Sequence, residues 1–220
     1  MTGSFPRRVA VILPVVLALA SCSGGGQPQT ARPRILSPAE VARADSGRPP
    51  YTAADVYFMS GMIGHHAQAV LIAGWAPSHD ASGSLRTLCE RIVVGQRDEI
   101  GLMQGWLRTR REPVPNADGS GGHQMPGMDH NMMMPGMLTP EQLAELDQAR
   151  GPEFDRIFLT FMIQHHEGAL TMVDQLMNAR GAAQDDTIFK FAADVSADQS
   201  TEIARMQLML EARGGTPAPR

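Results

Sequence analysis

Apolar residues recur at helical intervals of three, four and seven positions in four stretches of the chain, and no stretch shows the sustained alternation of a β-strand. The four stretches span residues 52–75, 84–107, 152–180 and 186–213. Pro77 follows the first stretch and Gly214-Gly215 follows the last, and both residue types end helices. The pattern therefore predicts an all-α protein with four long helices.

Much of the chain consists of two copies of one unit. The matched positions are Asp55, Phe58, Met62, Ile63, His65, His66 and Ala69 with Asp155, Phe158, Met162, Ile163, His165, His166 and Ala169, followed by Gln96, Glu99, Ile100, Met103 and Leu107 with Gln199, Glu202, Ile203, Met206 and Leu210. Copy one spans residues 36–107 and copy two residues 138–210, and each opens with a hydroxyl–proline pair typical of a helix start, Ser37-Pro38 and Thr139-Pro140. One helical hairpin cannot bury its apolar face alone, so the copies are expected to pair into a four-helix bundle domain over residues 36–210.

The beginning of the chain has the features of an export signal. Arg7 and Arg8 precede an apolar run that is too short to cross the ~30 Å hydrocarbon core of a membrane as a helix. The run ends in Leu19-Ala20-Ser21-Cys22, which resembles a bacterial lipobox. Residues 1–21 are thus predicted to be a lipoprotein signal peptide, Cys22 the lipidated residue and residues 22–35 a flexible tether. The alternative is an ordinary secretory signal with a chance cysteine at its end.

Composition excludes two classes of protein. The 19 basic and 23 acidic residues give a formal charge of −4 with no basic patch, which argues against a nucleic-acid partner. Only two cysteines occur, so a disulfide framework is ruled out, and Cys89 is expected to be a small buried hydrophobic residue. The 15 methionines, by contrast, need an explanation.

A segment rich in methionine and histidine joins the two copies, over residues 112–137. Its prolines and glycines prevent a helix, so it is predicted to be an exposed, mobile loop. Thioethers mixed with imidazoles are the donors that Cu(I), and similarly silver, prefers. The candidate loop ligands are His123, Met125, Met128, His130, Met132, Met133, Met134 and Met137. The alternative is a compositionally biased linker with no role.

Each copy also carries a Met-x-x-His-His sequence in its first long helix. Successive helical residues point about 100° apart, so one histidine of each pair is expected to line the bundle interior and its neighbour to lie at a helix–helix boundary or in solvent. The candidate metal ligands are Met62, His65, His66, Met162, His165 and His166. The alternative is one hydrogen-bonded core histidine per copy, with methionine as core filler.

Duplicated Gln-x-x-Glu-Ile-x-x-Met sequences pair Gln96 with Glu99 and Gln199 with Glu202. Inward glutamates in a helical bundle would suggest a di-iron oxidase, but such sites need Glu-x-x-His sequences, which the chain lacks. The two glutamates are therefore expected on the surface or in interhelical hydrogen bonds.

The lipobox-like signal, the paired histidines and the Gln-x-x-Glu helices together resemble the family called domain of unknown function 305, DUF305. The resemblance covers most of residues 36–210 and implies an exported, ferritin-like four-helix bundle built from two duplicated helical hairpins, in a family that includes copper-binding members. It places the paired histidines, with Met62 and Met162, at the family's motif positions. Copy one departs from copy two, because Ala67-Gln68 stands where copy two has Glu167-Gly168 and no methionine matches Met172.

Together these inferences predict a cell-envelope lipoprotein that binds copper, as Cu(I) and also silver, for copper tolerance, buffering or delivery, and that is not an enzyme. Its partners would be the copper ion and the membrane, through the lipid on Cys22. Because histidine must be neutral to bind a metal, binding in the bundle is expected to fade below about pH 6 while loop binding persists. Residues 211–220 are expected to be a disordered tail. The alternatives are a tethered scaffold whose methionine-rich loop docks a partner protein, and a metal-dependent redox enzyme.

Overall fold

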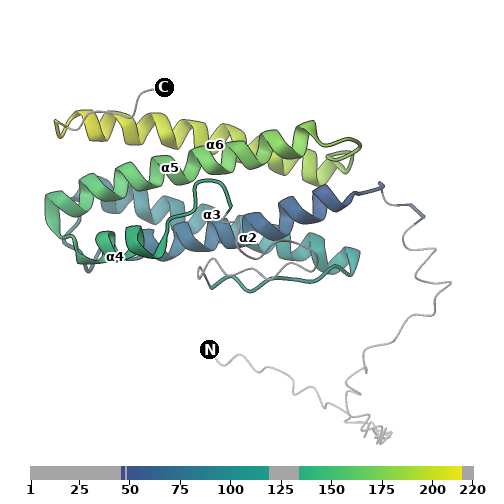
Figure 1. Cartoon of the computed structure of the whole chain (residues 1–220), viewed down its shortest axis with the longest axis horizontal. Coiled ribbons are helices and arrows are strands. Elements are labelled where there is room, and N and C mark those ends of the chain that lie inside the picture. The colour runs from purple at the N-terminus through teal and green to yellow at the C-terminus, as the bar shows by residue number, and fades with distance from the viewer. Residues whose placement is uncertain (1–45, 48, 119–133, 215–220) are drawn as a thin grey trace, which may run out of the picture. The chain divides into compact units, whose positions relative to one another are not determined.

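The computed structural model describes residues 46–47, 49–118 and 134–214, and within them the chain forms five α-helices and no β-strand (Figure 1). The helices are α2 (Ala53–Ala73), α3 (Gly83–Arg110), α4 (Pro140–Gln148), α5 (Gly151–Asn178) and α6 (Asp186–Glu211). Within these ranges no helix is long and apolar enough to cross a membrane. The predicted signal peptide, Cys22, the tether and the Ser37-Pro38 start of copy one lie outside the described residues.

The four long helices confirm the all-α prediction, and local capping sets their ends. Thr52 caps α2, since its hydroxyl accepts from the Asp55 N–H at 3.3 Å while the Asp55 carboxylate accepts from the Thr52 N–H at 2.7 Å. The predicted start of α3 at Ser84 was wrong, because Ser82 is the N-cap and the helix begins at Gly83. This helix continues past the predicted end to Arg110, where Arg111 stops it in the left-handed conformation.

Two further helix boundaries can be compared with the boundaries that the sequence predicted. The short helix predicted after Thr139-Pro140 is α4, with Thr139 and Gln142 forming a second capping box. Helix α6 reaches Glu211, so the first residue of the predicted C-terminal tail is still helical.

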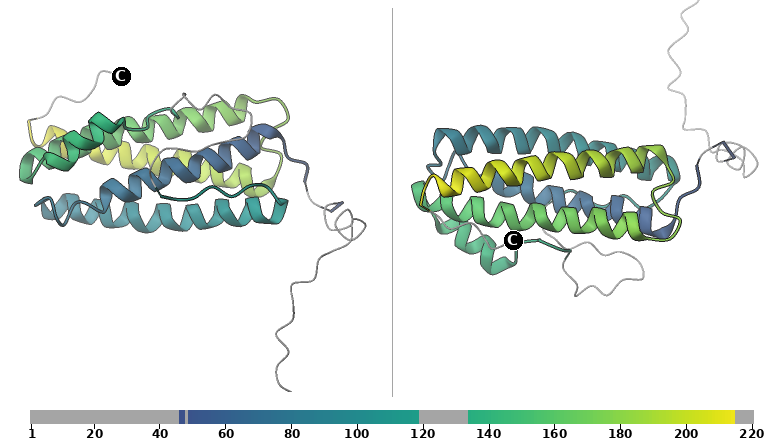
Figure 2. Two further views of the ribbon diagram at one scale, coloured as in Figure 1. Left: turned by 60° about the horizontal axis from the view of Figure 1, so that its bottom comes forward. Right: turned by 90° about the horizontal axis from the view of Figure 1, so that it is seen from above.

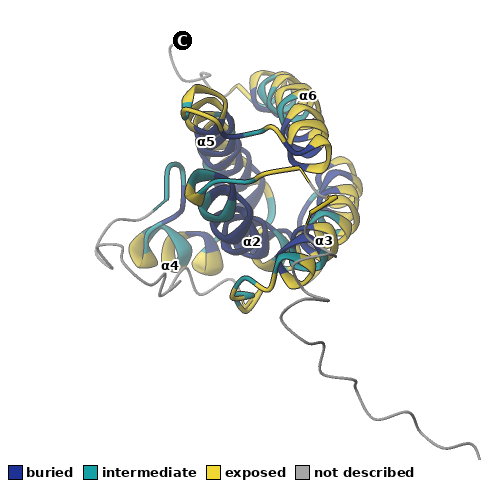
Figure 3. Ribbon diagram, turned by 90° about the vertical axis from the view of Figure 1, so that its right-hand side faces the viewer, coloured by how far each residue is buried: buried dark blue, intermediate teal, exposed yellow. Residues whose placement is uncertain are grey.

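The long helices form two hairpins, α2 with α3 and α5 with α6, that lie side by side (Figure 1 and Figure 2). Helices α2 and α5 carry most of the buried surface, whereas α3 and α6 each keep an exposed face (Figure 3). Fifteen of the 21 residues of α2 are buried, so this helix has no continuous polar side. The end of α3 lies beside the start of α6, and the start of α5 lies beside the turn between α2 and α3. The connection from α3 to α5 therefore joins opposite ends of the bundle.

Two apolar clusters fill the core. One holds the end of α2 and the first half of α5, with Phe154 and Phe158 fully buried. The other holds the first half of α2 and the second half of α5, with Phe58 and Phe191 in contact at 6.0 Å between ring centroids. The paired histidines occupy the middle of α2 and α5, where one cluster gives way to the other.

Matched side chains tie the ends of the two hairpins together. Asp55 accepts a hydrogen bond at 2.7 Å from the backbone N–H of Ala183, in the turn between α5 and α6. Asp155 occupies the equivalent position in copy two and accepts one at 3.1 Å from Ser82, at the start of α3. Each buried carboxylate thus fixes a turn of the other hairpin.

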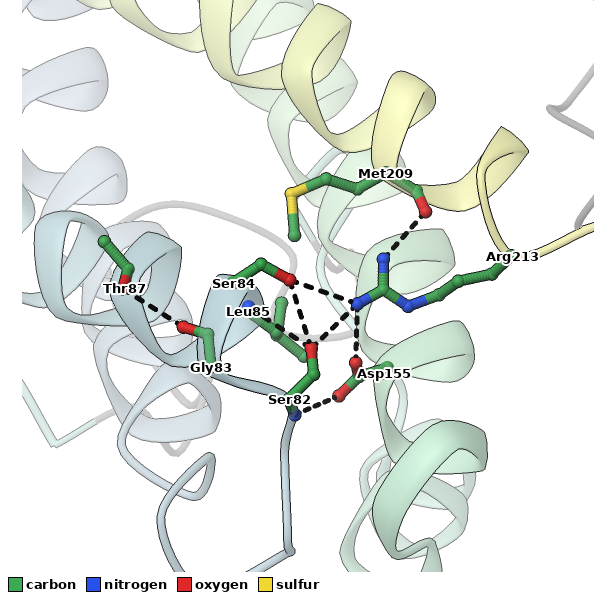
Figure 4. Close-up of polar contacts among 8 residues, drawn as sticks. All are labelled: Ser82, Gly83, Ser84, Leu85, Thr87, Asp155, Met209 and Arg213. Carbon is green, nitrogen blue, oxygen red and sulfur yellow. Dashed lines mark hydrogen bonds and ion pairs between the residues drawn. The ribbon is translucent and has the colours of Figure 1, made fainter.

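Arginines at the ends of α3 and α6 complete these ties. Arg213 donates to the Asp155 carboxylate at 2.8 Å and to the Ser82 hydroxyl at 2.7 Å (Figure 4). Arg110, its counterpart in copy one, pairs with Asp185, the N-cap of α6. The end of each outer helix is therefore held to the beginning of the other.

Residues 134–138 pack against α2 and α5, and we call them the crossing segment. The exposed fraction of Met137 is only 7%, so the prediction of an exposed loop over residues 112–137 was wrong at its end. Leu138, the first residue of copy two, is 2% exposed. Gln68 accepts from the Leu138 N–H at 2.8 Å and donates to its carbonyl oxygen at 3.1 Å. Gly168 provides the space, because a Cβ atom there would lie 2.1 Å from the Pro135 carbonyl oxygen. The close approach of this segment thus depends on one glutamine and one glycine.

Candidate metal centre

His65 on α2 and His165 on α5 face each other across the middle of the bundle. Both side chains have an exposed fraction of 0%. Their ring centroids lie 3.8 Å apart with the planes inclined by 40°. The matched positions of the two copies therefore meet at one point, as a paired arrangement of the duplicated helices requires.

The ring nitrogens of this pair are largely without partners. His65 Nε2 donates to the Pro135 carbonyl oxygen at 3.0 Å. His65 Nδ1 and both ring nitrogens of His165 have no hydrogen-bond partner among the described residues. Buried polar atoms are paired in most proteins, so unpaired imidazole nitrogens in the core favour a site that takes a ligand.

Burial keeps both of these rings neutral. Desolvation, reinforced by the neighbouring His66, lowers the pKa of His65 to about 3, against a smaller opposite effect of the Pro135 carbonyl. Desolvation and then His65 hold the pKa of His165 well below its ordinary value. Neutral imidazole is the form that binds metals. In the folded protein these two imidazoles are therefore neutral at mildly acid pH.

The second histidine of each pair contacts an outer helix. His66 Nε2 lies 2.8 Å from Glu99 Oε2 on α3, and His166 Nε2 lies 2.7 Å from Glu202 Oε2 on α6. Both imidazoles are fully buried, so the solvent alternative for these histidines was wrong, while the helix–helix boundary was right. The two glutamates make the interhelical contacts that the sequence predicted.

Four methionines lie close to the histidine layer along α2 and α5 or pack on Gly61, one turn before His65. Met62 and Met162 are fully buried one turn before the paired histidines. Met134 of the crossing segment lies over Gly61, with its sulfur 2.5 Å from the position that a Gly61 Cβ would take. The Met172 methyl group lies 3.4 Å from the same point. The end of the methionine-rich segment and α5 therefore bring thioether side chains together beside α2, one turn from His65.

The remaining predicted ligands lie outside the described residues. They are His123, Met125, Met128, His130, Met132 and Met133. Among the described residues, no group of three His, Cys, Asp or Glu side chains is placed to hold a metal ion.

Several further residues have structural roles, and only one of these roles was predicted from the sequence. Cys89 is 2% exposed, as expected, and burial raises the pKa of its thiol to about 12. His79, which the sequence analysis did not single out, is buried and contacts Asp147 at 3.1 Å. Gln68 and Gly168 were noted only as differences between the copies, yet they hold the crossing segment. That difference was the signal in the sequence that the two copies contact the segment between them in different ways.

The fold and the site define a class of protein. Its members are helical proteins with a duplicated core, in which buried, paired histidines of the two copies face each other. The chain belongs to the DUF305 family, described as a domain of unknown function, whose pattern matches residues 55–210. No curated protein matches the sequence.

Solved structures share the fold. A DUF305 protein from Streptomyces coelicolor, described as secreted, is similar with a TM-score of 0.64 and 26% identity over 76% of this chain and 98% of that chain. A DUF305 fragment from Deinococcus radiodurans is similar with a TM-score of 0.62 and 27% sequence identity, over 74% of this chain and 99% of that chain. CopM in its Cu(II)-bound form is similar with a TM-score of 0.56 and 29% sequence identity, over 72% of this chain and 96% of that chain. CopM has also been solved with Cu(I) and with silver.

Proposed function

We propose that this protein binds copper, as Cu(I), and silver by the same chemistry, in the cell envelope. The observation that carries the proposal is the fully buried His65–His165 pair, whose ring nitrogens are mostly unpaired, with the Met134 thioether packed on Gly61 one turn before His65 on α2. Imidazole and thioether donors in an apolar surrounding suit a soft monovalent ion. The metal-bound forms of CopM, a distant relative, support the same choice of ion.

The crossing segment gives the proposal a mechanism. Met134 is the last methionine before Pro135, whose carbonyl oxygen accepts the His65 hydrogen bond. The predicted loop ligands precede Met134 in the chain, so an ion captured by those methionines would reach the histidine pair without leaving thioether donors. Capture and ordered binding would then be successive steps of one path, serving copper tolerance, buffering or delivery.

The proposal includes a ferritin-like fold, a lipid anchor and a binding role. Matched ties at both ends of the bundle, Asp55 with Ala183 and Asp155 with Ser82, support a ferritin-like four-helix bundle from two duplicated hairpins. The lipobox-like sequence at Cys22 supports a lipid anchor on the extracytoplasmic side. The role proposed is binding rather than catalysis.

The test is an anaerobic titration of the purified full chain with Cu(I) against a competing chelator. Two variants separate the sites. One changes His65 and His165 to asparagine, and the other changes the six methionines of the segment to leucine, namely Met125, Met128, Met132, Met133, Met134 and Met137. Met177→Leu with Met209→Leu is the matched control, because these methionines lie at the far ends of α5 and α6.

Copper binding predicts at least a tenfold loss of affinity in each test variant and none in the control. If the wild-type chain takes no Cu(I) from the chelator, the copper proposal fails and the interaction scaffold becomes the better interpretation. Silver should reproduce the order of the variants, since it prefers the same donors.

A further inference from the structure

The hydrogen bond between His65 and Pro135 determines which ring nitrogen of the histidine carries the proton. A carbonyl oxygen can only accept, so Nε2 of His65, 3.0 Å from the Pro135 oxygen, is the nitrogen that bears the hydrogen. The ring is neutral in the folded protein, because burial lowers the pKa of His65 to about 3. A neutral imidazole has one N–H group and one nitrogen with a free lone pair. The free lone pair of His65 is therefore on Nδ1, which has no partner among the described residues.

His165 has no such acceptor, although it matches His65 in the duplication. Neither of its ring nitrogens makes a hydrogen bond within the described part of the chain. The two copies differ three residues after this histidine, where α2 has Gln68 and α5 has Gly168. The crossing segment thus fixes the tautomer of one histidine of the facing pair and not of the other.

Gln68 holds the crossing segment over His65. Its buried amide accepts from the Leu138 N–H at 2.8 Å and donates to the Leu138 carbonyl oxygen at 3.1 Å. It lies one turn after His65 on the same helix, so both side chains project from the same face of α2. The two bonds keep the segment on that face, and the position of the Pro135 carbonyl group therefore depends on Gln68.

We propose that Gln68 positions His65 for copper, because it holds the Pro135 carbonyl on Nε2 and so leaves Nδ1 as the nitrogen that binds the ion. Histidines that bind metals commonly donate their other N–H to a carbonyl or a carboxylate, which fixes the ring and makes the free nitrogen a better donor. Pro135 provides this acceptor for His65. The inference rests on the proposed copper function, and it adds the binding atom of His65 and the residue that acts through the crossing segment.

Nitrogen-15 NMR of the labelled full chain tests the proposal, since a protonated ring nitrogen and one with a free lone pair have different chemical shifts. Spectra are recorded at neutral pH without metal and then with Ag(I), a diamagnetic ion with the donor preference of Cu(I). Loss of signals in His65→Asn identifies the His65 resonances. The test variant is Gln68→Leu, and Gln175→Leu, on the exposed face of α5, is the control.

In the metal-free wild type, we expect the His65 proton on Nε2. Gln68→Leu should change the ratio of the two tautomers by roughly two- to tenfold, the equilibrium factor of one net hydrogen bond, so the two nitrogen shifts should approach each other. The control should leave both shifts unchanged. In the wild type, Ag(I) should move the Nδ1 resonance while Nε2 keeps its proton.

Each part of the proposal has its own contrary result. A proton on Nδ1 in the metal-free wild type, or an unchanged tautomer ratio in Gln68→Leu, would overturn the positioning role. Silver bound through Nε2 would overturn the choice of Nδ1 as the binding atom. A chain that takes up no silver would overturn the copper function together with the binding atom, whereas the metal-free spectra judge the role of Gln68 separately. The wild-type spectra need no variant, so they test the tautomer even where Gln68→Leu does not fold.

Discussion

His65 Nε2 lies 3.0 Å from the carbonyl oxygen of Pro135, and this hydrogen bond joins the methionine-rich segment to the buried histidine layer. The two features that sequence analysis treated as separate candidate sites are therefore neighbours. Gln68 and Gly168 hold the segment in this position, one by hydrogen bonds and the other by the absence of a side chain. The arrangement allows each part to be tested by a single substitution.

Gly168→Ala should detach or strain the crossing segment. The new methyl group would lie 2.1 Å from the Pro135 carbonyl oxygen and 2.5 Å from the Gly136 Cα atom, both of them backbone atoms. We expect the free energy of unfolding to fall by about 2 kcal/mol or more, as for other overpacked sites. Gly101→Ala is the control, because nothing lies within 4 Å of its Cβ position, and it should stabilise α3 by about 0.5–1 kcal/mol. Urea denaturation measures both, and equal effects would contradict the close packing.

Gln68→Leu should release the crossing segment without a steric clash. The substitution removes both hydrogen bonds to the Leu138 backbone and leaves its buried N–H and carbonyl groups unpaired. The expected cost is about 2 kcal/mol or more in unfolding free energy. Amide exchange at Leu138 should accelerate, whereas Gln175→Leu on the exposed face of α5 should leave it unchanged. Unaltered exchange at Leu138 in the first variant would show that the glutamine is dispensable.

The metal-free protein should lose stability as the pH falls below about 6.5. The pKa of His65 is lowered to about 3 in the folded state, so between these values the unfolded chain binds more protons and unfolding becomes easier. Above the unfolded-state pKa, the His65 ring is neutral in both states, so its titration does not lower the free energy of unfolding. His65 alone should account for roughly 2 kcal/mol of the loss between pH 7 and pH 5. His165 acts in the same direction.

Urea denaturation at both pH values, with a chelator present, measures this dependence. His65→Asn should flatten the profile, because asparagine does not titrate. An unchanged slope in that variant would show that His65 is not the group responsible.

Arg213→Ala should loosen the tie between the two hairpins. The side chain donates to Asp155, which is 2% exposed, and to the Ser82 hydroxyl (Figure 4). Its loss leaves a buried carboxylate with only its backbone donor, at an expected cost of about 2 kcal/mol, less than for a fully buried pair because Arg213 is partly exposed. Arg205→Ala, at an exposed position of α6, should change the unfolding free energy little. A matching loss in both variants would indicate a general charge effect rather than this contact.

Most of the fold followed from local patterns in the sequence. Apolar spacing located the four long helices, and the capping residue Thr52 and the Thr139-Pro140 pair marked two helix starts correctly. The start of α3 was misplaced because two serines, Ser82 and Ser84, are both suitable caps, and only the packing of the turn selects one. The exposed-loop prediction failed at Met137 because burial of an irregular segment depends on what lies beneath it.

The sequence by itself determined the helical hairpins, their duplication and the residue types that can bind a soft metal, because helical periodicity and ligand chemistry are properties of neighbouring residues. Only the tertiary structure decided which residues meet. It brought His65 to His165, gave His66 and His166 their glutamate partners, and laid Met134 beside α2. These contacts join residues far apart in the chain, and their distances depend on how α2 and α5 pack and on where the crossing segment passes, which no local pattern encodes.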